Sequence, residues 1–175
     1  MKKSNIIKIS HSLMKQYLNQ DDILIDATLG NGFDSLYCSN LVKKIYAFDI
    51  QETALKNSQE LLKEKNNIAL ILDSHENYRA YLLAPTAAIF NLGYLPGGDK
   101  NITTKAASTL KTIKSLLNEH SLRFLLVVVY PGHHEGQKES DQLALYFNEM
   151  TSHEVIIIKL VNRSLTSPYI FLVLK

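Results

Sequence analysis

Short apolar runs alternate along this chain with segments whose apolar residues recur at helical spacing. The runs predict strands over residues 23–28, 44–50, 68–72, 86–92, 122–130, 155–161 and 169–174. The helical spacing predicts helices over residues 10–18, 33–42, 52–65, 76–82, 103–117 and 137–150. Strands that are apolar throughout and are separated by helices indicate a parallel sheet with helices on both faces.

The last two predicted strands break this alternation, because only residues 162–168 lie between them. A parallel crossover needs a dozen or more residues, so these two strands should pair antiparallel. We therefore expect an α/β, Rossmann-like fold with a doubly wound, mostly parallel seven-stranded sheet closed by a C-terminal antiparallel hairpin. Residues 1–175 are expected to form a single domain, since no linker or internal repeat interrupts them.

Composition narrows the class of protein without identifying a function. The net charge of +2 is well below the basic excess of most dedicated nucleic-acid binders. The only cysteine, Cys38, excludes an intrachain disulfide, and the N-terminus has no signal-peptide pattern. The longest apolar run, residues 124–129, is far shorter than the roughly 20 residues of a membrane span. We expect a cytoplasmic protein without membrane contact.

The first predicted strand carries a carboxylate, Asp26, near its end and continues into a glycine turn, in the segment DATLGNG. Gly30 and Gly32 tolerate positive φ and let the backbone approach a ligand closely. Ligands of open parallel sheets bind at the carboxyl ends of the strands, where the winding reverses. Asp49 ends the second strand about twenty residues later, which suits a carboxylate that accepts both hydroxyls of a ribose.

Three interpretations of this turn compete. The first is a tight strand–helix connection in which Asp26 is incidental. The second is a dinucleotide site, but Ser35 stands where a third glycine is typical, and Asp34 repels a pyrophosphate at the helix N-terminus. The third, a cationic cofactor with a ribose and no phosphate, fits better. Asp26 then faces its amino group, directly or through water, above Gly30 and Gly32.

This description matches S-adenosylmethionine (SAM), and the chain resembles the class I SAM-dependent methyltransferases over almost its full length. The resemblance rests on DATLGNG, Asp49, Asp73 and the closing hairpin, in that order. It implies that the cofactor is SAM, and that it is held by Asp26, Thr28, Gly30, Asn31, Gly32, Asp49, Gln51, Asp73, Ser74, His75 and Asn91. For His75, adenine contact and local capping both remain open.

The turn NLGYLPGG, residues 91–98, follows the buried fourth strand. Class I enzymes that methylate nitrogen often have Asn or Asp, two prolines and an aromatic residue here. Asn91 and Tyr94 match the first and last positions, while the prolines are absent. The resemblance implies that the Asn91 oxygen accepts a hydrogen bond from the target N–H, and that Tyr94 stacks on a planar base. A turn cap for Asn91 and simple packing for Tyr94 are the alternatives.

The segments NLGYLPGGDKNITT and YPGHHEG resemble a narrower family, the small bacterial "putative rRNA methylases" of the MnmM type. That resemblance implies methyl transfer from SAM to the exocyclic amine of 5-aminomethyl-(2-thio)uridine at tRNA position 34. The product is 5-methylaminomethyl-(2-thio)uridine, and the partner is the anticodon stem-loop of tRNA. One departure is Phe33, where His or Tyr is expected, so a polar contact would be lost while stacking would survive.

The segment YPGHHEG follows the fifth strand and brings histidines to the same edge of the sheet. An aliphatic amine must lose a proton before it attacks, and histidine as a residue type suits proton transfer. The predicted catalytic residues are Asn91, Tyr94 and His133. The predicted substrate contacts are Leu92, Gly93, Tyr94, Pro131, Gly132, His133, His134 and Glu135. Ordinary loop histidines are the alternative, and no metal is expected, because this is a poor zinc ligand set.

Phosphate contacts with tRNA would fall to scattered basic residues, although for each of them taken alone an ordinary surface charge is the favoured interpretation. The candidates are Lys2, Lys3, Lys8, Lys100, Lys105, Lys138 and Arg163. A homodimer would enlarge this surface. The alternative functions are methylation of rRNA or of a small-molecule amine, a catalytically silent RNA-binding module, and a dinucleotide oxidoreductase.

Overall fold

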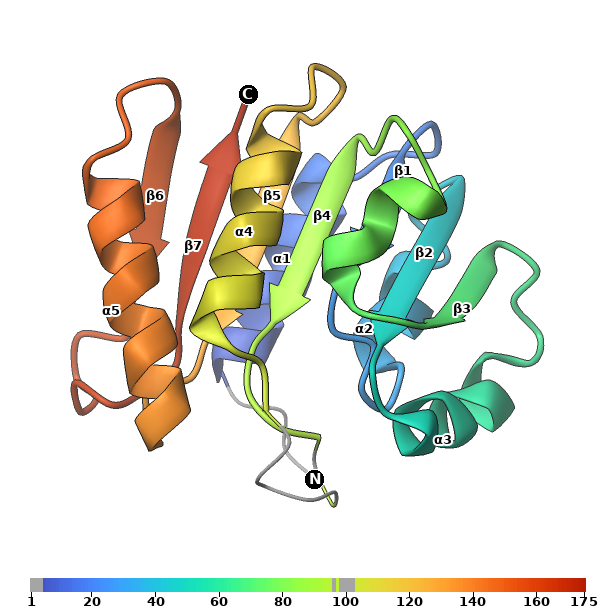
Figure 1. The fold of residues 1–175 in the computed structure, drawn as a ribbon, viewed down its shortest axis with the longest axis horizontal. Helices are drawn as coiled ribbons and strands as arrows, with labels where there is room; N and C mark the ends of the chain where they lie inside the picture. The colour runs from blue at the N-terminus through green and yellow to red at the C-terminus, as the bar shows by residue number, and fades with distance from the viewer. Residues whose placement is uncertain (1–4, 96, 98–102) are drawn as a thin grey trace.

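The computed structural model describes residues 5–95, 97 and 103–175. In this part of the chain, a mixed sheet carries helices on both faces (Figure 1). The strands are β1 (Ile23–Asp26), β2 (Lys44–Asp49), β3 (Ile68–Leu72), β4 (Ala87–Asn91), β5 (Phe124–Val129), β6 (Glu154–Ile158) and β7 (Tyr169–Leu174). The helices are α1 (Asn5–Tyr17), α2 (Phe33–Cys38), α3 (Glu52–Leu62), the 3-10 helix η1 (His75–Ala80), α4 (Ala106–Leu117) and α5 (His134–Asn148).

The described strands lie in the order β3-β2-β1-β4-β5-β7-β6. Strands β1 to β5 pair parallel with their neighbours, whereas β7 runs antiparallel to both β5 and β6. The predicted doubly wound sheet with an antiparallel C-terminal pair is thereby confirmed. From β1 the chain winds outward to β2 and β3, and it then returns to β4 on the other side of β1. The switch point between β1 and β4 is where such sheets bind ligands.

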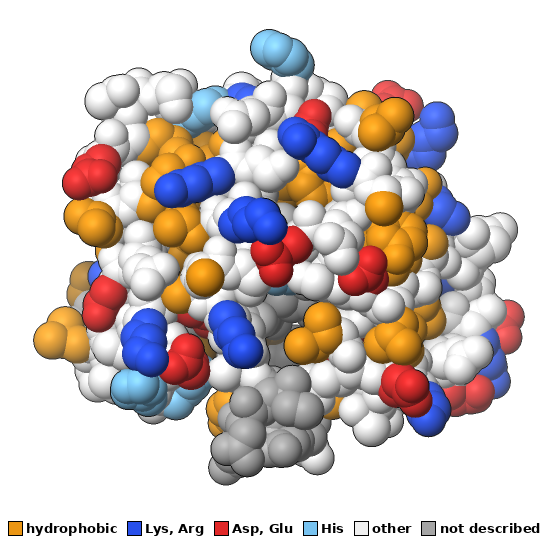
Figure 2. Space-filling model, in the orientation of Figure 1, with side chains coloured by type: hydrophobic (Ala, Val, Ile, Leu, Met, Phe, Trp, Pro, Cys, Tyr) orange, Lys and Arg blue, Asp and Glu red, His pale blue; other side chains and the backbone are white. Residues whose placement is uncertain are grey.

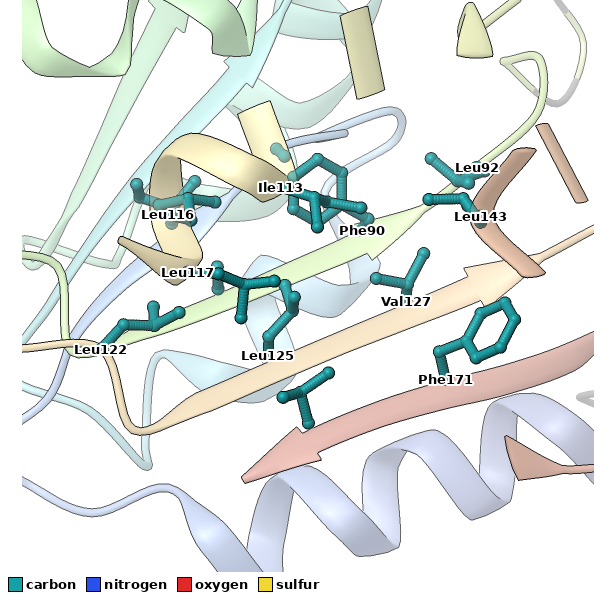
Figure 3. Packing of buried hydrophobic residues seen from close by; sticks show 14 of the residues in the cluster. Phe90, Leu92, Ile113, Leu116, Leu117, Leu122, Leu125, Val127, Leu143 and Phe171 are labelled. Atoms are coloured by element: carbon teal, nitrogen blue, oxygen red, sulfur yellow. The ribbon is translucent and has the colours of Figure 1, made fainter. Parts of the chain in front are cut away.

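The two faces of the sheet bury alternate residues of each strand. Leu24 and Leu126 pack with α1, α2 and α3, whereas Ile25 and Leu125 pack with η1, α4 and α5. This division follows from the two-residue period of a strand, which sends neighbouring side chains to opposite faces. Because both faces are covered, the central strands read as unbroken apolar runs. Figure 3 shows the second face, with Ile113 of α4 above β4.

The difference from the predicted elements that bears on the site is the start of α5. This helix begins at His134 rather than near residue 137, so His134 and Glu135 lie in its first turn and not in a loop. The His133 side chain caps the helix by accepting a hydrogen bond from the Gly136 N–H at 3.1 Å. The first turn has no apolar periodicity and contains a glycine, which is a poor helix former. Periodicity therefore placed the start too late.

Other observed boundaries also differ from the predicted ones. Helix α1 begins at Asn5 rather than near residue 10, and its buried Ile6 packs on the sheet with Met14. The short helix after β3 is a 3-10 helix that begins one residue earlier than predicted. Helix α4 begins at Ala106 rather than at 103. In the described part of the chain, no helix is both long enough and apolar enough to cross a membrane.

The core position Ile113 tests the packing of α4 on the sheet. Its side chain is fully buried in the cluster that contains Phe90 and Leu125. We expect Ile113→Ala to lower the free energy of unfolding by about 2–5 kcal/mol, because the cavity it leaves cannot close completely. Leu165→Ala, at a fully exposed aliphatic position, should change it by less than about 0.5 kcal/mol. Urea unfolding followed by circular dichroism measures both, and equal effects would contradict this packing.

Candidate active site

A cavity of about 860 Å³ opens at the carboxyl edge of the sheet. It is lined by residues that follow β1, β2, β3, β4 and β5 and by the segment between β6 and β7. Its size falls within the range of about 300–1,000 Å³ typical of small-molecule and cofactor sites. The cavity spans the switch point between β1 and β4, as the order of the strands predicts.

The structure gathers most of the predicted site residues around this cavity. The predicted residues that line it are Thr28, Gly30, Asn31, Asp49, Gln51, Asp73, Ser74, His75, Asn91, Leu92, Gly93, Tyr94, Gly132 and His133. The predicted residues that do not line it are Asp26, Gly32, Pro131, His134 and Glu135. His134 and Glu135 project from the first turn of α5, where Glu135 contacts both His134 and Lys138.

Asp26 lies beneath the cavity and is only 2% exposed. Its carboxyl accepts hydrogen bonds from the Ser35 hydroxyl at 2.6 Å and from the Thr28 N–H at 3.2 Å. Burial raises its pKa to about 7 against these hydrogen bonds, which lower it. Gly32 also has a packing role, since its φ is +80° and a Cβ there would lie 2.9 Å from the Cβ of Ser58.

Asp49 holds the first glycine of the loop. One of its carboxylate oxygens accepts from the Gly30 N–H and the other from the Gln51 N–H, each at 3.0 Å. Each oxygen keeps a further lone pair for a ligand. Burial raises the pKa of Asp49, and the backbone hydrogen bonds oppose that shift. The carboxylate thus shapes the loop as well as facing the cavity.

Asp73 and His75, which follow β3, both form hydrogen bonds with other side chains of the protein. The Asp73 carboxylate accepts from the Asn77 amide, the Tyr81 hydroxyl and the Ser74 N–H, and these bonds hold its pKa below the ordinary value. His75 is buried, and its Nδ1 lies 2.9 Å from the Thr112 hydroxyl of α4. Burial lowers the pKa of His75 to about 4, so its ring is neutral at pH 7. The cap of η1 is Ser74, not His75.

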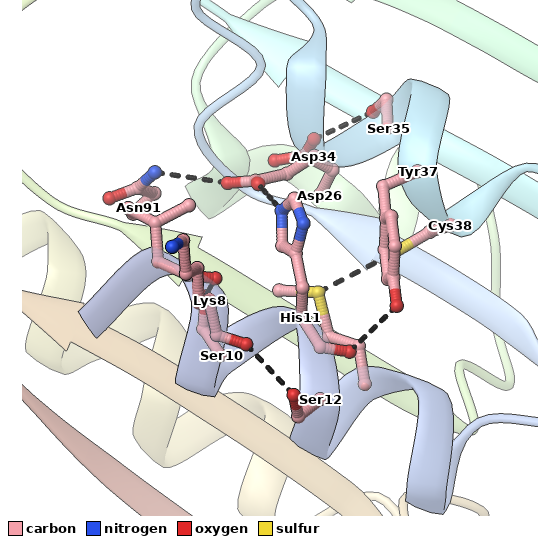
Figure 4. A network of polar contacts seen from close by, with 12 residues as sticks. Lys8, Ser10, His11, Ser12, Asp26, Asp34, Ser35, Tyr37, Cys38 and Asn91 are labelled. Carbon is pink, nitrogen blue, oxygen red and sulfur yellow. Dashed lines mark hydrogen bonds and ion pairs between the residues drawn. The ribbon is translucent and has the colours of Figure 1, made fainter. Parts of the chain in front are cut away.

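Asn91 is held from two sides at the end of β4. Its backbone N–H donates to the Thr28 hydroxyl at 2.7 Å, and its side-chain Nδ2 donates to Oδ2 of Asp34 at 2.9 Å. The other oxygen of Asp34 lies 2.7 Å from Nε2 of His11 (Figure 4). Sequence reasoning missed this link, because His11 and Asn91 are 80 positions apart. The only available signal was a histidine on the otherwise apolar face of a predicted helix.

Tyr94 and His133 form the wall of the cavity beyond Asn91. Their rings meet edge to face, with centroids 5.7 Å apart. Because Nδ1 of His133 accepts from the Gly136 N–H, the neutral ring carries its proton on Nε2. That Nε2 atom and Oγ1 of Thr103 are both buried without a hydrogen-bond partner among the described residues. Buried polar atoms are rarely left unpaired, so this wall suits a polar ligand.

The turn after Asn91 is supported by a buried carboxylate. The Gly93 N–H donates to the Thr104 hydroxyl at 2.9 Å, and that hydroxyl donates to Glu139 of α5 at 2.7 Å. The Thr109 hydroxyl donates to the other oxygen of Glu139 at 2.8 Å. Gly93 has a φ of +126°, which a residue with a side chain rarely adopts. The second half of the predicted motif lies partly outside the described residues, at 96 and 98–102.

The predicted phosphate contacts are dispersed. Lys8, Lys105, Lys138 and Arg163 are exposed, and Lys105 also lines the cavity, whereas Lys2, Lys3 and Lys100 lie outside the described residues. Figure 2 shows Lys and Arg side chains interspersed with Asp and Glu on the face that carries α4 and α5. Among the residues that the structure describes, no group of three or more His, Cys, Asp or Glu side chains could hold a metal ion.

Comparisons of the sequence match this chain to methyltransferases. A family model described as "Putative rRNA methylase" matches residues 45–174. The chain is 31% identical to the chloroplastic "tRNA (mnm(5)s(2)U34)-methyltransferase" of Arabidopsis thaliana, with 94% of this chain and 68% of that protein covered.

Two solved structures extend the comparison to the fold. A "putative rRNA-methylase" from Clostridium thermocellum superposes with a TM-score of 0.90 at 28% identity, covering 100% of both chains. A "putative methyltransferase" from Streptococcus mutans, in complex with SAH, superposes with a TM-score of 0.87 at 37% identity, covering 100% of this chain and 99% of that one.

The raised pKa of Asp26 predicts a dependence of stability on pH. The unfolded carboxyl titrates near 3.8 and the folded one near 7, so the folded state holds the extra proton between these values. The contribution of Asp26 to stability is therefore complete below about pH 4 and is lost as the pH rises through about 7. Relative to Asp26→Asn, the unfolding free energy of the wild type should fall by up to about 1.4 kcal/mol per pH unit in that window. Denaturant titrations from pH 4 to 8 measure this difference, and a flat difference would contradict it.

Proposed function

The chain belongs to the rRNA-methylase family and is a SAM-dependent methyltransferase, and from that premise we propose that its substrate is a tRNA wobble uridine. The proposed reaction transfers a methyl group from SAM to the exocyclic amine of 5-aminomethyl-(2-thio)uridine at position 34. The product is 5-methylaminomethyl-(2-thio)uridine. The Arabidopsis relative supports the substrate by its name, and the Streptococcus mutans relative, which contains SAH, supports the cofactor. The observation that carries the proposal is the Asn91 carboxamide beside the Tyr94–His133 wall.

The charge around the cavity fits SAM. The carboxylates of Asp34, Asp49, Asp73 and Glu76 line it, whereas Lys105 is the only lysine or arginine among the described lining residues. Such a site favours a cationic ligand and disfavours the pyrophosphate of a dinucleotide. When bound, SAM supplies an electrophilic methyl group on its sulfonium sulfur.

Particular residues would hold the parts of this cofactor. Asp49 has lone pairs left for ribose hydroxyls, and the turn through Gly30, with a φ of +52°, presents backbone to the cavity. Ile50 is 63% exposed and also lines the cavity, so it offers an apolar surface to the adenine ring. From the sequence, Ile50 was predicted only as the last residue of a strand, and not as part of the site. Asp26 would act from below the loop, by shaping it, rather than by direct contact.

Asn91 would position the amine. Its Oδ1 can accept a hydrogen bond from the substrate N–H, which directs the nitrogen lone pair and stabilises the positive charge that develops on nitrogen. The edge-to-face rings of Tyr94 and His133 would enclose the uracil. Nε2 of His133 and Oγ1 of Thr103, unpartnered in the described part of the chain, suit the polar edge of such a base.

The hydrogen bond from Gly136 changes the role proposed for His133. The lone pair on Nδ1 is already occupied, so the neutral ring can donate from Nε2 but cannot take a proton there. We therefore assign His133 the role of a hydrogen-bond donor to the substrate. Gly136 is required for this placement, since a Cβ at that position would lie 2.8 Å from Nε2 of His133 and 2.0 Å from the Tyr130 carbonyl oxygen.

The tRNA would approach over the cavity mouth. Lys105 lies at the cavity itself, and Lys8, Lys138 and Arg163 are exposed positions for phosphate contacts. Lys138 also forms an ion pair with Glu135 at 2.8 Å, so its charge is partly neutralised and it is a weaker candidate for a phosphate contact. A single domain over residues 1–175, a homodimer and a cytoplasmic location stay predictions.

The decisive experiment is a methylation assay on tRNA from cells that lack this activity. The purified protein and SAM should add one methyl group to 5-aminomethyl-2-thiouridine, as seen by mass spectrometry of the digested nucleosides. A synthetic tRNA without the aminomethyl group is the control and should stay unchanged. No gain of mass, with SAM binding shown by calorimetry, would overturn the proposed substrate and direct the assay to rRNA and to small amines.

Asn91→Ala tests the role of the strand-four turn. We expect a loss of turnover of about a hundredfold, the order found for single groups that act on the transition state, with SAM affinity nearly unchanged. Turnover on tRNA and the dissociation constant for SAM by calorimetry measure the two effects. Asn148→Ala, at an exposed position in α5, is the matched control. An equal loss of binding and turnover would make Asn91 a cofactor or folding residue instead.

A further inference from the structure

The contacts of Asn91 define which atom of its side chain faces the cavity. A carboxamide has a donor end and an acceptor end, and a catalytic acceptor must present its oxygen to the substrate. Rotation of the amide by 180° would present the NH₂ group instead, which repels a substrate N–H. Some other group must therefore select one orientation over the other.

Asp34 supplies that selection. An ionised carboxylate can only accept hydrogen bonds, so the Asn91 atom that lies 2.9 Å from Oδ2 of Asp34 must be the nitrogen. The flipped amide would place two oxygens against each other. With Nδ2 committed to Asp34, the remaining polar atom, Oδ1, is left for a ligand in the cavity that both residues line.

His11 in turn fixes Asp34. Its Nε2 lies 2.7 Å from Oδ1 of Asp34, so the carboxylate is held through both oxygens (Figure 4). The His11 ring stacks on Tyr37 of α2 with centroids 4.0 Å apart, and the Tyr37 hydroxyl donates to the His11 carbonyl at 3.0 Å. These contacts lock the ring between α1 and α2. The ring therefore has little freedom to release Asp34.

Stability alone does not explain this arrangement. The side chains of His11 and Asp34 are only 9% and 14% exposed. Polar pairs that are largely buried contribute little net stability, because desolvation offsets their attraction, and apolar residues of similar volume often do as well. A carboxylate that lines a cavity and binds a second cavity residue has a use beyond folding. Hydrogen bonds in a chain also polarise one another, so Asp34 strengthens Asn91 as an acceptor.

We propose that Asp34, held by His11, is a positioning residue that orients the Asn91 carboxamide with Oδ1 toward the substrate nitrogen. The inference rests on the proposed function for its catalytic consequence, and on geometry for the orientation itself. Asp34 follows the glycine loop directly, so it also connects the proposed cofactor loop to the acceptor on β4. His11 acts one step further away, through Asp34.

A double-mutant cycle tests the catalytic part. At saturating SAM, Asp34→Ala should lower kcat about tenfold or more and leave the KM for tRNA nearly unchanged. The loss of one of the four carboxylates that line the cavity should weaken SAM binding by a smaller factor. In the Asn91→Ala background, Asp34→Ala should lower kcat no further, because the side chain that Asp34 orients is absent. Independent, multiplicative losses would overturn the proposal. Asp141→Ala, which removes an exposed carboxylate of α5, is the matched control and should keep wild-type kcat.

Two conservative variants separate positioning from folding. Asp34→Asn keeps the size of the side chain but has only one acceptor oxygen, which His11 can occupy, so its NH₂ group then faces Asn91 and favours the flipped amide. It should therefore lose kcat about as much as Asp34→Ala, and it replaces that variant in the cycle if Asp34→Ala does not fold. His11→Gln, whose amide can donate to Asp34, should retain clearly more kcat than His11→Ala. Wild-type kcat in Asp34→Asn, or equal losses in the two His11 variants at equal melting temperatures, would overturn the positioning role.

A measurement without turnover keeps the orientation testable if the proposed substrate is wrong. In protein labelled with 15N-asparagine, the Asn91 side-chain amide should be protected from exchange with water in the wild type and lose that protection in Asp34→Ala. An Asn91 amide that exchanges equally fast in both proteins would overturn the orientation. A wild type that shows protection but does not methylate 5-aminomethyluridine would overturn the proposed substrate alone.

Discussion

The site depends on two hydrogen bonds to the end of β4, one from the turn after β1 and one from the first turn of α2. The Thr28 hydroxyl accepts from the backbone of Asn91, and Asp34 accepts from its side chain. They span the switch point, where the connections after β1 and β4 leave in opposite directions and the cavity opens between them. Without these bonds, the sheet would still bring the two strands together, but the Asn91 side chain would not be fixed in position relative to the glycine loop.

Buried and half-buried carboxylates recur at this edge of the sheet. Asp26 and Asp49 shape the first loop, Asp34 holds Asn91, and Glu139 supports the turn at Gly93 through Thr104. Burying these groups costs free energy, as the raised pKa values of Asp26, Asp49 and Glu139 indicate. A cationic ligand in the cavity would offset part of that cost. The acidic character of the edge therefore agrees with the cofactor proposed for this family.

Much of the fold was predictable, because buried parallel strands and covering helices leave distinct periods in the sequence. The closing hairpin followed from a connection too short for a crossover, and β3 and β7 were predicted at their observed bounds. The start of α5 was wrong because its first turn is polar and is held by the His133 cap, a side-chain contact that periodicity does not register. For the site, the sheet edge sufficed to place Asp49, Asn91 and Tyr94, since carboxyl ends of parallel strands meet there.

The sequence by itself determined the order of the elements, the edge where the cavity forms and the residue types that reach it. The tertiary structure alone decided which polar groups pair: His11 with Asp34, Asp34 with Asn91, and the His133 ring with Gly136. It also placed Asp26 beneath the cavity rather than in it. The reason is geometric, because burial patterns survive a shift of an ångström, whereas a hydrogen bond does not. Such pairings depend on how α1 and α2 dock on the sheet, which no local stretch of sequence encodes.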